Sequence, residues 1–146
     1  MKRFFAVFTI TLAASFVAVA FAPQSVRGFT NDPKATPAYS VLVLRKAAVE
    51  ADLADLSSKL TDDSVGVRAK RFELNAISRE MDRMQTVARD SVPKLSNAYG
   101  NLILSKVALE VELNGLLNNY TSKYPDVKKK MAEIDALERE IGNLLK

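Results

Sequence analysis

Residues 33–60 read PKATPAYSVLVLRKAAVEADLADLSSKL, and residues 93–120 read PKLSNAYGNLILSKVALEVELNGLLNNY. The two stretches are copies of one another, and the similarity extends without a gap over residues 33–86 and 93–146. Eighteen of the 54 aligned positions are identical, each with its twin 60 residues further on: Pro33, Lys34, Ala38, Tyr39, Leu42, Leu44, Lys46, Ala48, Glu50, Leu53, Leu56, Thr61, Val67, Lys70, Glu73, Ala76, Arg79 and Glu80. An internal repeat identifies the structural unit, so one supersecondary element is expected to occur twice.

Both copies carry apolar side chains at steps of three and four residues, a spacing that turns one face of an α-helix inward. The first copy has the series Tyr39, Leu42, Lys46, Val49, Leu53, Leu56, Leu60 and the series Val67, Lys70, Leu74, Ile77, Met81, Met84, Ala88. The second copy has Tyr99, Leu102, Lys106, Leu109, Leu113, Leu116, Tyr120 and then Val127, Lys130, Ile134, Leu137, Ile141, Leu144. Each copy therefore predicts two helices of about 24 residues, each about 36 Å long.

Start and stop signals divide these helices. Thr36 followed by Pro37 is a capping hydroxyl followed by proline at the first helical position. Asp63 or Ser64 is placed to cap the second helix. The second helix must end or kink before Pro93, because the residue before a proline avoids the α region.

The predicted fold is all-α, with two tandem helical hairpins that turn at residues 61–64 and 121–124. Two hairpins packed as an antiparallel four-helix bundle would bury the wide apolar stripes, and this is the preferred arrangement. The alternative is an elongated coiled coil in which the second and third helices run nearly continuously through a kink at Pro93.

Residues 1–22 are predicted to be a targeting element. A short basic start, Lys2 and Arg3, precedes an apolar run over residues 4–22, and residues 18–20 have the small-x-small form of a cleavage site before Phe21. If this segment is not cleaved, it is long enough to span a bilayer as an anchor helix. Either way, we expect the rest of the chain to lie outside the cytoplasm, in the periplasm or secreted.

The predicted domain plan has three parts. Residues 23–36 form a linker, and residues 37–146 form a helical domain made of the repeats 33–91 and 93–146. The only membrane contact that we expect is through residues 4–22.

The composition excludes several classes of function. The 146 residues include no His and no Cys, which removes the usual catalytic triads and zinc sites, so we expect no enzyme, no metal and no cofactor. The formal net charge is +4, but without Lys2 and Arg3 the 21 basic residues become 19, against 17 acidic residues. The charges are interspersed, and nucleic-acid binding is not expected.

Lysines interrupt the apolar series at equivalent points of the two copies, namely Lys46 and Lys106, and Lys70 and Lys130. One interpretation is a buried polar contact that fixes how the helices pair. The preferred interpretation is that each aliphatic stem packs on the helix while the ammonium group reaches solvent.

Two basic clusters open the second helix of each copy: Arg68, Lys70, Arg71 and Lys128, Lys129, Lys130. Cations at a helix N-terminus oppose the helix dipole, so helix stability alone would not select them. In an up-down-up-down bundle both clusters fall at one end, and they predict a basic tip for an anionic partner such as a polysaccharide, lipid headgroups or an acidic protein. The alternative is a solvated end that acidic neighbours partly neutralise.

The second turn, with Tyr120-Thr121 and then Tyr124-Pro125-Asp126-Val127, resembles the periplasmic coiled-coil hairpin of the polysaccharide chain-length determinants, the co-polymerase family. That resemblance implies a periplasmic helical hairpin. In the family a histidine precedes the Pro-Asp-Val stretch, where this chain has Tyr124. The first copy lacks the Pro-Asp pair.

From these patterns we expect an exported helical protein with a structural or adaptor role in the cell envelope, acting by coiled-coil packing against a protein partner or itself. The alternative is a periplasmic holdase-type chaperone, or a binder of an anionic envelope ligand through the basic tip.

Overall fold

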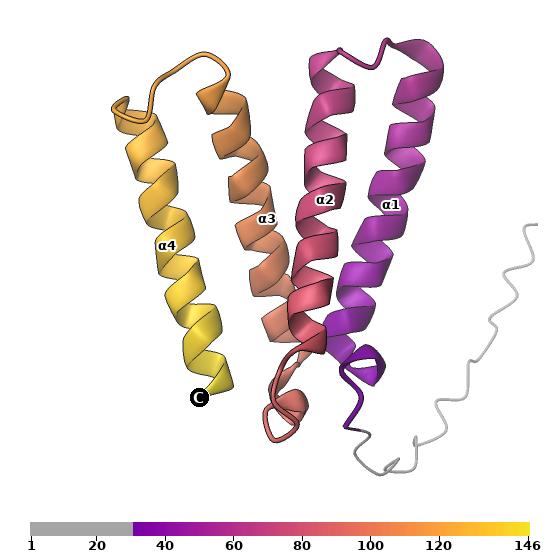
Figure 1. Cartoon of the computed structure of the whole chain (residues 1–146), viewed down its shortest axis with the longest axis vertical. Coiled ribbons are helices and arrows are strands. Elements are labelled where there is room, and N and C mark those ends of the chain that lie inside the picture. Colours follow the sequence, from indigo (N-terminus) through magenta and orange to yellow (C-terminus); the bar gives the residue numbers. More distant parts are fainter. Residues whose placement is uncertain (1–30) are drawn as a thin grey trace, which may run out of the picture.

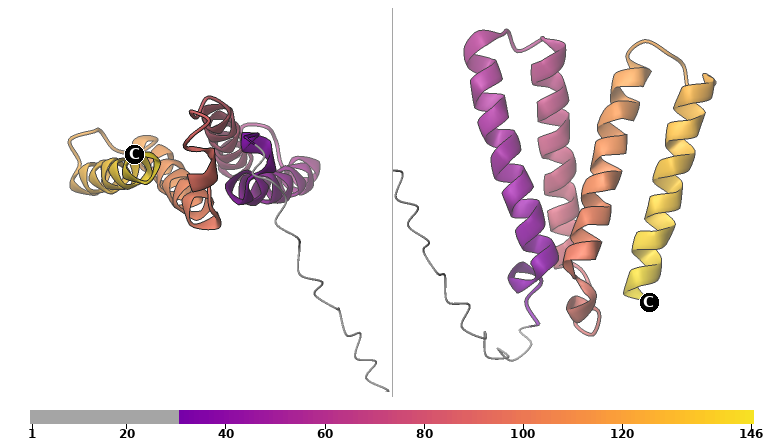
Figure 2. Two further views of the ribbon diagram at one scale, coloured as in Figure 1. Left: turned by 90° about the horizontal axis from the view of Figure 1, so that it is seen from below. Right: turned by 180° about the vertical axis from the view of Figure 1, so that it is seen from behind.

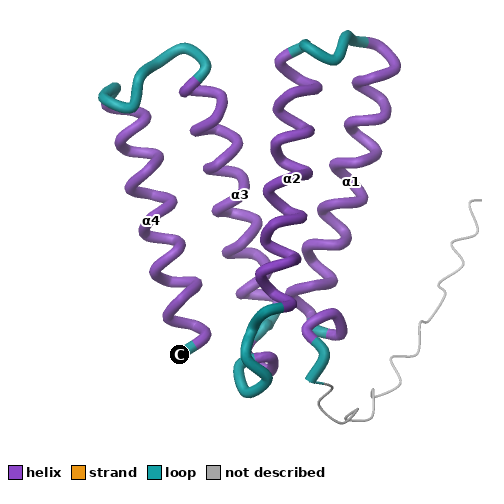
Figure 3. Tube along the Cα trace, viewed as in Figure 1, coloured by secondary structure: helices purple, strands orange, loops and turns teal. Residues whose placement is uncertain are grey.

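The computed structural model describes residues 31–146, which form four helices (Figure 1). They are α1 (Pro37–Lys59), α2 (Val65–Gln85), α3 (Asn97–Leu117) and α4 (Pro125–Leu145), with two 3₁₀ turns, η1 (Pro33–Ala35) and η2 (Val92–Lys94). Among these residues every regular element is helical and none is a strand, so the all-α prediction is confirmed for this part (Figure 3). None of the helices between residues 31 and 146 has the length and apolar character needed to cross a membrane. The predicted targeting element, residues 1–22, and most of the predicted linker lie outside the described residues.

The helix starts follow the capping signals of the sequence. The Thr36 hydroxyl accepts a 3.3 Å hydrogen bond from the Tyr39 amide, and Pro37 occupies the first helical position. The Ser64 hydroxyl accepts a 3.3 Å bond from the Val67 amide in the same way. Ser64, one of the two predicted candidates, is therefore the cap of α2.

The two hairpin turns share one geometry. The Ser64 amide donates to the Thr61 carbonyl at 3.0 Å, and the Tyr124 amide donates to the Thr121 carbonyl at 3.0 Å. Pro125 is the first residue of α4. The repeat therefore preserves the turn even though the proline occurs in the second copy only.

Between α2 and α3 the chain reverses direction. The residues from Thr86 to Ser96 form a connector that contains η2, and beyond it α3 packs against both α1 and α2 (Figures 1 and 2). The alternative in which the second and third helices run on as one nearly continuous rod is therefore wrong. Instead, the two hairpins meet near the connector and diverge towards their turns (Figure 2, right).

The main core lies among α1, α2 and α3. One cluster of buried side chains joins the three helices and the connector: Ala38, Leu42, Val49, Ala76, Ile77, Met81, Met84, Leu95, Tyr99, Ile103 and Val107. Helix α4 packs mainly on α3, where Val127 and Ile134 are its buried side chains. The first hairpin and α3 thus share a core, while α4 extends from one side of it.

The two hairpins come into close contact at Gly100. A Cβ placed on Gly100 would lie 3.0 Å from the Ala38 Cα, 3.1 Å from its carbonyl oxygen and 3.2 Å from the Val41 Cβ. The Ala38 amide, one of the donors that the start of a helix leaves unpaired, donates to the Leu95 carbonyl at 3.2 Å. Glycine therefore allows α3 to cross α1 in backbone contact.

The connector also holds the C-terminal end of α4. The Leu145 carbonyl accepts 3.1 Å hydrogen bonds from the Ser91 hydroxyl and from the Lys94 ammonium. A carbonyl of the last helical turn has no partner within its own helix, so these donors stabilise the helix end.

Candidate functional site

The predicted basic tip lies where α2 and α4 begin, at the turn end of the two hairpins (Figure 1). Its six cations are Arg68, Lys70, Arg71, Lys128, Lys129 and Lys130. The hairpins diverge in this direction, so the turns are the most widely separated parts of the two repeats (Figure 1).

Two of the tip lysines each form an ion pair between the two helices of their own hairpin. The Lys70 ammonium lies 2.7 Å from an Asp52 carboxylate oxygen, and the Lys130 ammonium lies 2.7 Å from the equivalent oxygen of Glu112. The hydrogen bond that Lys70 donates to Asp52 raises the pKa of Lys70 and lowers the pKa of Asp52. The repeat thus reproduces one ion pair between the two helices of each hairpin.

Three further cations of the tip contact acidic or amide side chains. Arg71 lies 2.5 Å from Asp62, and Lys129 lies 4.0 Å from Glu133 on its own helix. The Arg68 guanidinium donates a 3.2 Å hydrogen bond to the Asn118 side chain and so reaches from α2 to the end of α3. Much of the positive charge at the tip is therefore balanced inside the chain.

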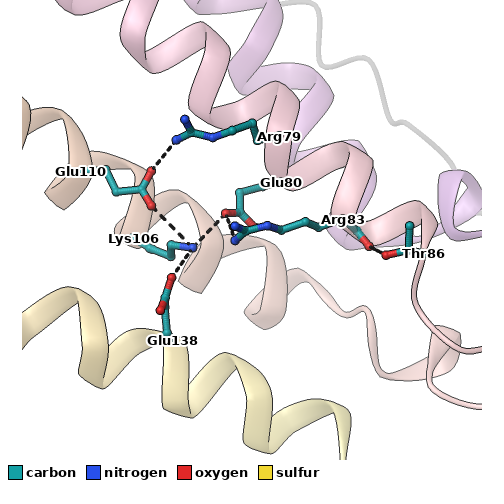
Figure 4. A network of polar contacts seen from close by, with 7 residues as sticks. All are labelled: Arg79, Glu80, Arg83, Thr86, Lys106, Glu110 and Glu138. Atoms are coloured by element: carbon teal, nitrogen blue, oxygen red, sulfur yellow. Dashed lines mark hydrogen bonds and ion pairs between the residues drawn. The ribbon is translucent and has the colours of Figure 1, made fainter.

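A second polar site, at the junction of the hairpins, centres on Lys106 (Figure 4). The Lys106 side chain is only 3% exposed, and its ammonium lies 2.9 Å from Glu80 of α2, 2.9 Å from Glu138 of α4 and 3.5 Å from Glu110 of its own helix. Arg83 also binds Glu80, at 2.9 Å. We call Lys106, Glu80, Glu110 and Glu138 the junction cluster; it joins α2, α3 and α4.

The surroundings of Lys106 keep it charged. Burial alone would lower its pKa, but the hydrogen bonds to Glu138 and Glu80 and the nearby Glu110 outweigh burial, so the pKa is raised. The bond from Lys106 lowers the pKa of Glu138. The junction cluster therefore holds one buried, charged ammonium group beside three acidic side chains.

An open cavity of about 500 Å³ adjoins the junction cluster between α2, α3 and α4. Its wall includes Tyr99 and Ile141 in addition to Glu80, Lys106 and Glu138. Tyr99 is 4% exposed; burial and the nearby Glu80 raise its pKa, so the phenol stays protonated at neutral pH. The cavity thus offers a protonated phenol and an engaged lysine, neither of which is a free base or nucleophile.

The repeat-equivalent lysine has different surroundings. The Lys46 side chain is 37% exposed and lies 3.6 Å from Glu50, its neighbour on α1. The preferred interpretation of the seam lysines therefore describes Lys46 but is wrong for Lys106, for which the alternative of a buried polar contact holds. The sequence carried one signal of this difference, because the second copy has Glu138 where the first has Ser78.

Among residues 31–146 no group of three or more acidic side chains is arranged to hold a metal ion. Comparison of the chain with protein-family models, with curated proteins and with solved structures finds no match.

Proposed function

We propose that this protein is a non-enzymatic structural or adaptor component of the cell envelope, which acts by packing its helices against a protein partner. Residues 1–22 direct its export, either as a signal cleaved before Phe21 or as a retained membrane anchor. The two hairpins act as an antiparallel four-helix bundle with one side open to the partner.

The observation that carries this proposal is an apolar groove on the outer side of the second hairpin. The groove has a volume of about 400 Å³, and its apolar wall consists of Leu109 of α3 and Ala136 and Leu137 of α4. On the first hairpin, Leu44 of α1 is 72% exposed and Val43 is 43% exposed. We infer that a protein partner covers these exposed apolar side chains, because burying them in a contact would remove them from water.

The junction cluster supports the same role. A buried lysine that three carboxylates share fixes how the hairpins sit on one another, and a fixed frame lowers the ordering cost of binding a partner.

Site-specific photo-crosslinking in cells tests this function. A photoreactive residue at Leu137 or at Leu44 is expected to give a discrete adduct of defined mass, while the same residue at Asp90 in the connector serves as the control. An absence of adducts at both apolar positions would contradict the proposal. Fractionation and intact-mass measurement test the export step: we expect a periplasmic chain that begins at Phe21, or an uncleaved chain in the membrane fraction.

A second candidate, the anionic-ligand or holdase function of the tip, is favoured by apolar side chains that lie exposed beside its lysines. Val65 is 76% exposed, and the rings of Tyr120 and Tyr124 stack with centroids 4.2 Å apart beside the exposed Lys128 and Lys129. Exposed aromatic and cationic side chains together favour binding to lipid headgroups. The resemblance of this turn to chain-length determinants favours binding to an anionic polysaccharide.

Vesicle flotation at low salt tests the tip. Replacing Lys128 and Lys129 with glutamine should reduce binding to anionic vesicles. Binding to neutral vesicles, which we expect to be weak, should stay unchanged. If the wild-type protein floats with neither kind of vesicle, the tip does not bind lipid. The holdase function is tested separately, by whether the protein suppresses the aggregation of unfolded clients.

A further inference from the structure

Two different surfaces form the contact between the two hairpins. We call them the acceptor side and the donor side, and these names do not refer to hydrogen bonding. The acceptor side is the face of the first hairpin that α3 covers, and the donor side is the face of α3 that packs on it. Two ion pairs cross this contact: Lys106 with Glu80 at 2.9 Å, and Arg79 with Glu110 at 3.3 Å.

Because the hairpins are copies, each carries both sides, and one of each is unused. The second hairpin has an acceptor side whose groove is lined by Leu109, Glu133, Ala136, Leu137, Arg139 and Glu140. The equivalent residues of the first hairpin are Val49, Glu73, Ala76, Ile77, Arg79 and Glu80, and all but Arg79 are buried. The groove is thus the counterpart of a surface that is covered within the chain.

The first hairpin has the matching unused donor side. Ile103 and Val107 of α3 are buried in the core shared with the first hairpin, and their equivalents on α1 are Val43 and Ala47, which are both exposed. The donor side of α1 therefore presents small apolar side chains to solvent.

The charges needed to repeat the contact are also present on the unused faces. All four residues of the two ion pairs are identical in the repeat: Arg79 and Glu80 recur as Arg139 and Glu140, and Lys106 and Glu110 have the counterparts Lys46 and Glu50. Arg139 and Glu140 are exposed at the edge of the groove, and among residues 31–146 neither forms an ion pair like those of their counterparts.

We propose that the partner is a second copy of this chain, which places its α1 in the groove of α3 and α4 and repeats the contact between the hairpins. The inference rests on the proposed adaptor function and names its partner. Glu140 then pairs with Lys46 of the second copy, and Arg139 pairs with Glu50 of the second copy. The contact is head-to-tail, so each copy retains one free side and assembly continues into a ring or a filament.

One difference between the two copies of the repeat sets how closely the helices can approach in this contact. Ser40 stands at the position of Gly100, so its side chain would meet Ala98, the equivalent of Ala38, in the neighbouring copy. We therefore expect the helices of two copies to cross at a wider separation than α1 and α3 do. The contact between copies is then weaker than the one within the chain, which also has the connector to hold its two sides together.

Zero-length carbodiimide coupling tests the pairing, since it joins an amine and a carboxylate only when they touch. The full chain is mixed as ¹⁵N-labelled and unlabelled protein, coupled and digested for mass spectrometry. A mixed-isotope link between Lys46 and Glu140 is expected, and the link between the solvent-accessible pair Lys130 and Glu112, 2.7 Å apart within one chain, is the positive control. If the control link forms and the Lys46–Glu140 link does not, the inference is wrong.

Charge reversal supplies the second test, by sedimentation velocity over a range of concentrations. Glu140→Lys and Lys46→Glu should each weaken self-association by about tenfold or more, and the double variant should recover most of it. Asp90→Lys makes the same change of charge in the connector and should leave association unchanged. Equal association by the wild type and all four variants would also overturn the inference.

The two proposals can fail separately. If the chain stays monomeric while Leu137 gives a discrete adduct with another protein in cells, the adaptor function stands and self-assembly does not. If neither self-association nor any adduct is seen, both are wrong.

Discussion

Lys106 of α3 and Glu80 of α2 lie 2.9 Å apart across the junction of the two hairpins, with side chains that are 3% and 6% exposed. A buried ion pair is not a strong source of stability in itself, because both charges must leave water. Removing one partner is nevertheless expensive, because it leaves the other charge buried. The pair therefore sets the relative position of the hairpins more than it adds to the free energy of unfolding.

Replacing Lys106 with methionine should lower the free energy of unfolding by about 3 kcal/mol, because Glu80 would keep only Arg83 as its partner. The methionine retains the apolar stem, so the loss reports on the charge. Urea unfolding at a low protein concentration, where association is negligible, measures this difference.

Lys46→Met is the matched control, since it changes the equivalent residue of the first copy. Lys46 is 37% exposed and pairs with Glu50 alone, so the change should stay within about 0.5 kcal/mol. Equal losses in the two variants would mean that the burial of Lys106 has no energetic consequence.

The crossing of α1 and α3 gives the next prediction. Gly100→Ala places a methyl group 3.0 Å from the Ala38 backbone, which cannot rotate away, so α3 must shift. The helix propensity of alanine favours the change by about 1 kcal/mol, but overpacking opposes it by about 1–3 kcal/mol. We expect a net destabilisation of about 1 kcal/mol in thermal or urea unfolding.

Gly115 provides the contrasting case on the same helix. A Cβ at Gly115 meets nothing within 4 Å, so Gly115→Ala should gain helix propensity without strain and stabilise the protein by up to about 1 kcal/mol. If Gly100→Ala stabilised the protein as much as Gly115→Ala, the close contact with Ala38 would carry no energetic weight.

The spacing of apolar residues predicted the four helices and their turns, because helix periodicity and caps are local properties. The environment of Lys106 was not predictable in this way. Lys46 and Lys106 are identical residues in equivalent local sequence, and only the packing of one hairpin on the other separates them. The informative positions are those where the copies differ: Gly100 replaces Ser40 at the crossing, and Glu138 replaces Ser78 beside Lys106.

Acid should weaken the junction cluster through Glu138. The hydrogen bond from Lys106, which outweighs the effect of burial, holds the pKa of Glu138 below its ordinary value of 4.5, and Arg83 adds to the effect. A carboxyl group whose pKa is lowered by folding contributes stability above its unfolded pKa and loses it as the pH falls through the folded value. The raised pKa of Lys106 contributes stability that is fully present below about 10.5 and is lost only at higher pH, so this contribution stays constant in the acid range.

Urea midpoints measured between pH 6 and pH 3 test this linkage. The wild-type midpoint should fall as the pH drops below about 4.5, and Glu138→Gln should show a smaller fall because it has no proton to gain at that position. An identical fall in both proteins would assign the acid sensitivity to other carboxylates, such as Asp52, whose pKa is also lowered.

The cap of α2 gives the last prediction. The Ser64 hydroxyl accepts a hydrogen bond from the Val67 amide at 3.3 Å, whereas its counterpart Tyr124 makes no side-chain cap and stacks on Tyr120 instead. Ser64→Ala should therefore lower the free energy of unfolding by about 1 kcal/mol, while Ser64→Asp should retain the cap and most of the stability. Hydrogen exchange of the amides in the first turn of α2 should accelerate in Ser64→Ala and remain slow in Ser64→Asp. If both variants exchanged at the wild-type rate, the turn bond from the Ser64 amide to the Thr61 carbonyl would be sufficient to start the helix.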